Sequence, residues 1–288
     1  MLKPKMSTQL EIHSWQEVVQ RLTVYPGWQE THRYLSPEEQ KYGITIQRLW
    51  DILDQAWDET QASSTESSDF SHFLHTYYQH PVWLINAAFS ESDENTIRDR
   101  LAAVRLITHT QPQKILDFGG GIGTVARLCS ITSPDIQVID LVDITDFRHM
   151  IQSYLTDYSN IRVLDRPEPP YDAIISTEVL EHLIDPIKAV VEINGLMRIG
   201  GGFAASWSFA PCIKCHLPQN FHLNRLMPWI IRSLGFGFYG FERRGSQVYG
   251  YVKHSDVTPT MIKQARLLEW LSRLPLPLDR LLLLMRGF

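Results

Sequence analysis

The sequence predicts an α/β protein with a mostly parallel sheet that is covered by helices on both faces. Three observations support this fold class. From Pro112 onwards, short apolar strands alternate with helices. The first of these strands runs directly into a glycine-rich loop at Gly119–Gly123. The residues before Pro112 show helical periodicity only. Alternation of strands and helices is typical of parallel sheets covered on both sides.

The N-terminal part reads as a helical cap over residues 1–110. Trp15, Val18 and Leu22 recur at three- and four-residue spacing, as on one face of a helix. Ser36-Pro37-Glu38-Glu39 has the order of a helix start, with a capping serine, proline at the first position and acids in the first turn. Further helices are expected over residues 44–57, 70–89, which Pro81 interrupts, and 96–108.

The strands of the second region, residues 111–254, follow in regular order. They are expected over residues 114–118, 136–142, 161–164, 171–176, 203–208, 236–243 and 247–252. Asp185-Pro186 opens a helix that runs through Leu196, and the last two strands form a hairpin around Arg244-Gly245-Ser246. Residues 255–288 form a C-terminal helical tail.

Composition excludes several classes of protein. The chain has 288 residues and a net charge of −5, which argues against a dedicated nucleic-acid binder. Its 3 cysteines make a disulfide framework unexpected and fit a reducing compartment. Met1–Leu10 lacks the apolar centre of a signal peptide, so a cytoplasmic location is expected. No run reaches the roughly 20 apolar residues of a membrane span. The segment 274–288 is either a docked helix or one that contacts a membrane or a partner peripherally.

The loop after the first strand has the spacing Asp117-x-Gly119-x-Gly121-x-Gly123. Glycines let a ligand approach the backbone, and the free amides of the following helix offer hydrogen-bond donors. Asp117 precedes the glycines, where its carboxylate would meet the cationic amino-acid tail of a bound ligand. Asp143 ends the next strand, where it would accept hydrogen bonds from ribose hydroxyls. Asp140 is the alternative candidate for that role, and its side chain points to the opposite face of the strand.

Over residues 112–252 these motifs resemble the class I S-adenosylmethionine-dependent methyltransferases. The resemblance implies a seven-stranded Rossmann-like sheet, S-adenosylmethionine as methyl donor and S-adenosylhomocysteine as product. It also implies that Glu178 flanks the cofactor and that Asp165 borders the adenine. One departure is Ile199, where the family commonly has proline before the glycines. The cofactor-binding residues implied in this way are Asp117, Gly119, Gly121, Gly123, Asp143, Asp165 and Glu178.

After the fourth strand comes Glu178-Val179-Leu180-Glu181-His182. In a helical turn its two acids and histidine share one face. His222, after the fifth strand, would bring a second imidazole to the same edge of the sheet. The segment is similar to that of ubiquinone-pathway O-methyltransferases and small-RNA 2′-O-methyltransferases. This resemblance implies that Glu178, Glu181, His182 and His222 hold Mg²⁺. A general base without metal and a purely structural role are the alternatives.

Cys212-Ile213-Lys214-Cys215-His216 formally matches a c-type haem attachment pattern and half of a zinc site, with His216 and His222 as further ligands. The alternative is a surface loop over the acceptor pocket.

In the cap, Tyr77, Tyr78, His80 and Trp83 either stack on a planar substrate, border the cofactor or pack as ordinary core residues.

These observations together predict a methyltransferase that acts on an oxygen or nitrogen atom of a small molecule. His182, His222 or Glu181 would orient or deprotonate the acceptor. The acidic composition and the aromatic cap favour a small acceptor over a polymer, because phosphate contacts need clustered basic residues. An RNA or protein methyltransferase and a non-catalytic cofactor-binding subunit are the alternatives.

Overall fold

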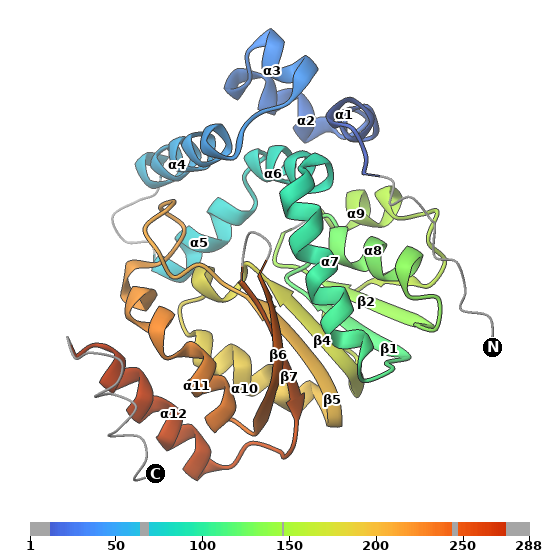
Figure 1. Cartoon of the computed structure of the whole chain (residues 1–288). Coiled ribbons are helices and arrows are strands. Elements are labelled where there is room, and N and C mark those ends of the chain that lie inside the picture. Colours follow the sequence, from blue (N-terminus) through green and yellow to red (C-terminus); the bar gives the residue numbers. More distant parts are fainter. Residues whose placement is uncertain (1–11, 64–68, 146, 244–246, 275–288) are drawn as a thin grey trace.

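The computed structural model describes residues 12–63, 69–145, 147–243 and 247–274 and is built around one seven-stranded sheet with the order β3-β2-β1-β4-β5-β7-β6 (Figure 1). The strands are β1 (Lys114–Phe118), β2 (Val138–Val142), β3 (Ile161–Val163), β4 (Tyr171–Thr177), β5 (Met197–Ser206), β6 (Phe236–Arg243) and β7 (Gln247–Lys253). Strands β1 to β5 are parallel, whereas β7 runs antiparallel to both of its neighbours. The predicted fold class is confirmed, and the chain reverses order next to β1, where open α/β sheets bind their ligands.

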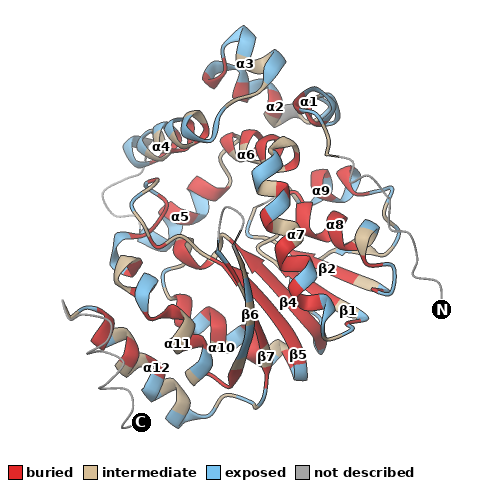
Figure 2. Ribbon diagram, in the orientation of Figure 1, coloured by how far each residue is buried: buried red, intermediate tan, exposed pale blue. Residues whose placement is uncertain are grey.

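Alternation along the strands divides the core into two layers. Ile115 and Leu116 are both fully buried, and they point into separate clusters on opposite faces of the sheet. One face is covered by α7 (Glu94–Thr108), α8 (Thr124–Thr132) and α9 (Arg148–Tyr154), and the other by α10 (Pro186–Leu196), α11 (Met227–Ser233) and α12 (Pro259–Ser272). In Figure 2 the inner strand β4 is buried along its whole length, whereas the edge strand β6 is partly exposed.

The helical cap precedes α7. It comprises α1 (Trp15–Leu22), α2 (Pro26–Thr31), the 3₁₀ turn η1 (His32–Tyr34), α3 (Pro37–Tyr42), α4 (Ile46–Ser63), α5 (Phe70–Tyr78) and α6 (Val82–Ser92). Ser36 caps α3 as expected. Its hydroxyl oxygen accepts from the Glu39 amide, and the Ser36 amide donates to the Glu39 carboxylate. Pro81 separates α5 from α6, which divides the helix predicted over residues 70–89.

A buried ion pair joins the cap to the sheet region. Arg127 of α8 lies 2.8 Å from Glu91 of α6, and both side chains are almost fully buried. The Tyr154 hydroxyl donates to the same carboxylate at 3.1 Å. Removing either charge would leave the other one buried and uncompensated, so the pair keeps the cap in register with α8.

Some predictions differ from the structure or fall outside it. Strand β5 begins at Met197 and not at the expected Phe203, because Gly200–Gly202 belong to the strand. The hairpin turn 244–246 and the tail beyond residue 274 lie outside the described residues. The division into regions 1–110, 111–254 and 255–288 stays a prediction. None of the helices in the described ranges is long and apolar enough to cross a membrane.

Candidate active site

The glycine loop after β1 forms the floor of the site. The Gly119 amide donates to Val142 O at 2.9 Å, and the Gly121 amide to the Asp143 carboxylate at 2.8 Å. Gly121 has a φ of +54°, and an added Cβ would meet nothing within 4 Å. Its open side therefore faces free space, as a backbone that receives a ligand requires.

Asp117 lies beneath this loop. Its side chain is 1% exposed and accepts a hydrogen bond from the Ala126 amide at 3.1 Å. A Cβ on Gly120 would come within 2.6 Å of the carboxyl carbon, so the acid fills the inside of the loop. Burial raises the pKa of Asp117 to about 7, and the Ala126 bond opposes that shift. A cation bound above the loop would favour the ionised form.

The two acids of β2 have different environments. Asp140 is fully buried and forms a bidentate pair with Arg162 at 2.7 and 2.8 Å, while accepting the Tyr171 hydroxyl. Asp143, beyond the end of the strand, accepts from the Gly121 and Thr145 amides at 2.8 and 2.9 Å. Asp143 therefore lies at the glycine loop, and Asp140 is occupied elsewhere.

The segment after β4 does not form the continuous helical turn that was expected. Glu178 has a φ of +56°, and the turn η2 begins only at Leu180 (Leu180–His182). The Glu178 carboxylate accepts the Ser206 hydroxyl at 2.6 Å. Glu181 is fully buried and accepts the Ser208 amide at 2.9 Å, while its second oxygen has no hydrogen-bond partner.

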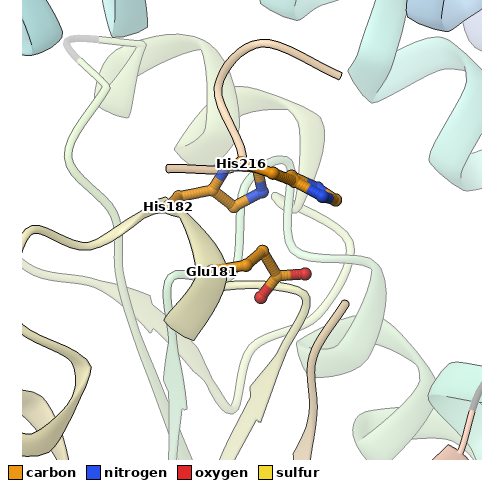
Figure 3. Close-up of side chains that lie close together, drawn as sticks. All are labelled: Glu181, His182 and His216. Carbon is orange, nitrogen blue, oxygen red and sulfur yellow. The ribbon is translucent and has the colours of Figure 1, made fainter. Parts of the chain in front are cut away.

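Glu181 and His182 converge with His216 rather than with His222 (Figure 3). One ligand atom from each of the three lies within 4.8 Å of the others. The Nδ1 atom of His182 lies 3.2 Å from Cys215 O, and that of His216 lies 3.0 Å from Ala210 O. Because a carbonyl can only accept, each Nδ1 carries the proton, and each Nε2 offers a lone pair.

The pKa shifts in this cluster follow from burial. Burial lowers the pKa of His182 to about 3, with His216 nearby as a second cause. Burial also lowers the pKa of His216. It raises the pKa of Glu181 well above its usual range, and the neighbouring Glu178 carboxylate adds to that shift. The buried Glu181 carboxyl thus lies with two neutral imidazoles and near the half-buried Glu178 carboxylate, an arrangement that either a proton or a cation would complete.

Other residues predicted for the site lie elsewhere or are engaged differently. His222 does not reach this edge of the sheet, because η3 (Pro218–Arg225) turns its Nδ1 to the Ser272 hydroxyl of α12 at 2.6 Å. Asp165 is exposed and pairs with Arg148 of α9. Cys212 and Cys215 do not belong to the ligand cluster found among the described residues, and burial raises the pKa of the Cys215 thiol. The haem interpretation and a zinc site that uses these cysteines therefore gain no support.

A pocket of about 440 Å³ opens beside His216, between the cap and the segment after β5. Its walls include Trp57, Phe70, Ile213, Leu217, Pro218 and Phe221. Two contacts tie the segment to α4, because the Lys214 amide donates to Asp54 at 2.7 Å and its ammonium group pairs with Asp58 at 2.6 Å. The sequence pointed to the loop over this pocket but not to His216 as the partner of Glu181.

Comparison with known proteins defines the class. A family model described as a methyltransferase domain matches residues 89–233, which is half of the chain. The chain therefore belongs to the methyltransferase domain family, and it is an S-adenosylmethionine-dependent methyltransferase.

The particular relatives are more distant. The chain is 25% identical over 214 residues to the ubiquinone biosynthesis O-methyltransferase of Paraburkholderia phymatum, covering 71% of this chain and 87% of that one. Among solved structures, LaPhzM aligns with a TM-score of 0.53 at 14% identity, covering 76% of this chain and 77% of that one. An O-methyltransferase family protein from Burkholderia thailandensis aligns with a TM-score of 0.50 at 14% identity, covering 79% and 76%. At such identities the structural matches support the fold alone.

Proposed function

We propose that this methyltransferase transfers the methyl group of S-adenosylmethionine to an oxygen or nitrogen atom of a small molecule. The observation that carries the proposal is that His216, a member of the Glu181–His182–His216 cluster, lines the pocket. Its walls are mainly apolar, and its volume of about 440 Å³ falls within the range typical of small-molecule sites. The net charge of −5 does not favour a nucleic-acid acceptor, because binding to a phosphate backbone needs clustered basic residues.

The donor would lie over the glycine loop. Asp117 and the Gly119, Gly121 and Gly123 backbone would hold the methionine end, Asp143 the ribose, and Glu178 the flank. Asp165 at the end of β3 would border the adenine from its exposed position. This placement follows the strand order, because β2, β1 and β4 present Asp143, the loop and Glu178 side by side.

The acceptor would enter through the pocket and meet His216. The reaction forms a bond from the acceptor atom to the methyl carbon and breaks the carbon–sulfur bond, which leaves neutral S-adenosylhomocysteine. The Nε2 lone pair of His216 would take the proton of the acceptor, while His182 and Glu181 would hold the His216 imidazole in position. Positioning is the main task, since the sulfonium donor is already activated.

The same three residues also fit a divalent cation. Each imidazole is oriented by a backbone carbonyl through Nδ1, as is typical of metal-ligating histidines, and one Glu181 oxygen is buried without a partner. Glu181, His182 and His216 would hold the ion, which supplies charge that lowers the pKa of an acceptor hydroxyl. Two imidazoles with one carboxylate suit zinc-type ions better than the Mg²⁺ expected from sequence.

A labelling experiment tests the proposal. The purified full chain is incubated with methyl-labelled S-adenosylmethionine and, separately, with the small-molecule, RNA and protein fractions of a cell extract. We expect label in the small-molecule fraction at a yield that salt does not change. In the Phe221→Ala variant the KM for the recovered acceptor should rise, while exposed Trp270→Ala serves as control. Salt-sensitive label in RNA or protein would contradict the proposal.

A further inference from the structure

Tyr78 of α5 has a buried polar atom that the described part of the protein leaves unpaired. The Tyr78 side chain is 8% exposed, and its hydroxyl has no hydrogen-bond partner. The neighbouring aromatic residues are satisfied. Tyr77 donates to Leu53 O at 3.3 Å, Trp83 donates to Tyr77 O at 3.0 Å, and His80 Nδ1 accepts the Val82 amide at 3.1 Å. A buried hydroxyl without a partner costs stability, so a ligand that supplies the partner would recover that cost.

Tyr78 adjoins the histidine cluster. Its ring meets His182 edge to face, with centroids 6.2 Å apart. Burial raises the pKa of its hydroxyl, and the charges of Cys215, Glu181 and Asp143 add to that shift. Asp143 follows β2 and Glu181 follows β4, and β1 lies between these two strands. Tyr78 contacts His182 after β4, and its neighbour Gln79 contacts Ile144 after β2, so the turn that carries both spans the end of β1, where the glycine loop begins.

The adjacent residue keeps Tyr78 at this position. The Gln79 side-chain amide donates to Ile144 O at 3.0 Å, directly after Asp143. The turn between α5 and α6 thus rests on the loop after β2. This turn thus reaches from the loop that carries Asp143, proposed for the ribose, to His182 of the cluster proposed for the acceptor, and the donor's sulfur would lie between the same two points.

We propose that the oxygen of Tyr78 faces the sulfonium group of bound S-adenosylmethionine and stabilises its positive charge. This inference rests on the proposed function, because it assumes the same placement of the donor. An oxygen lone pair in a site without water interacts strongly with a cation. The neutral sulfur of S-adenosylhomocysteine offers no such charge, so Tyr78 would favour the donor over the product.

The test is the affinity of Tyr78→Phe for the two nucleosides, measured by calorimetry on the full chain. We expect the dissociation constant of S-adenosylmethionine to rise about five- to tenfold, as for one lost hydrogen-bond-sized interaction. That of S-adenosylhomocysteine should change less than about twofold. Tyr77→Phe, which removes a hydroxyl already bonded within the cap, should change neither by more than this factor. An unchanged affinity for S-adenosylmethionine, or an equal loss for both, would overturn the inference.

Thermal unfolding of the ligand-free variant separates a functional role from a structural one. Tyr78→Phe removes an unpaired buried hydroxyl, so its melting temperature should equal or exceed that of the wild type. A lower melting temperature with unchanged affinities would assign the hydroxyl to packing and overturn the inference. If the wild type bound neither nucleoside, the proposed function would fail together with the inference. If wild type and variant bound both equally, the inference alone would fail.

Discussion

His182 and His216 lie edge to face with ring centroids 4.9 Å apart, although 33 positions separate His182 from its partner carbonyl at Cys215. Both rings direct Nδ1 to carbonyls of one segment, Ala210–Cys215. The segment thus sets the tautomer of both histidines at once. Each Nε2 keeps its lone pair, and one ring nitrogen of each histidine lies within 4.8 Å of a Glu181 oxygen. The segment is also one wall of the pocket.

The first prediction concerns His216. His216→Ala should lower kcat for the recovered acceptor by about 100-fold or more, the usual effect of losing a positioned base. The affinity for S-adenosylhomocysteine, measured by calorimetry, should stay within about threefold of the wild-type value. His222→Ala is the matched control, because His222 is bonded to Ser272 of α12. A greater loss of kcat in the His222 variant would reverse the assignment.

The second prediction separates backbone strain from ligand contact at glycine. Gly121 and Gly200 both have positive φ, +54° and +83°, and a Cβ at either position would meet nothing within 4 Å. Either Gly→Ala change should therefore cost about 1–2 kcal/mol of stability. Only Gly121→Ala should weaken the binding of S-adenosylmethionine, because only Gly121 faces the proposed crevice. Calorimetry and thermal melts on both variants check this, and equal affinities would contradict it.

The third prediction distinguishes the two acids of the second strand. Asp143→Ala should weaken S-adenosylhomocysteine binding by about 1–3 kcal/mol, for a lost charge-assisted bond to the ribose. Asp140→Ala should instead reduce the free energy of unfolding, because Arg162 and the Tyr171 hydroxyl lose their partner. Chemical denaturation and calorimetry measure the two effects. If only Asp140→Ala affected binding, the ribose contact would belong to Asp140.

The fourth prediction is a pH dependence that arises from Asp117. Its pKa rises from 3.8 to about 7 on folding, so the folded chain holds more protons than the unfolded chain between these values. Stability of the ligand-free protein should therefore fall as the pH rises through this window. The cationic end of S-adenosylmethionine favours the ionised carboxyl. Its affinity should thus increase up to tenfold per pH unit between about pH 5.5 and 7, then level off.

Calorimetry across this range measures the effect, and Asp117→Asn supplies the comparison. An amide has no charge to titrate, so the affinity of this variant should be weaker at pH 7 and nearly independent of pH. Parallel pH profiles for wild type and variant would assign the dependence to another group.

Sequence patterns alone determined the sheet, the glycine loop and the acids around it. Each depends on neighbours along the chain: alternation for β1 (Lys114–Phe118), the spacing of Gly119 and Gly121, and the position of Asp143 at a strand end. The strand order of an α/β sheet then brings these loops to one edge. Such local signals are readable because dihedral preferences and side-chain period act over a few residues.

Only the tertiary structure decided which histidine meets Glu181. His216 and His222 both follow β5, and the sequence pattern led to His222 as the expected member of the cluster. The choice depends on the Ser208 and Leu217 amides, which bond to the Glu181 carboxylate and carbonyl at 2.9 and 3.1 Å and fold the segment back over η2. The burial of the Tyr78 hydroxyl without a partner likewise follows from the packing of the cap and could not be predicted from the sequence. These contacts join residues far apart in sequence, and no periodicity encodes them.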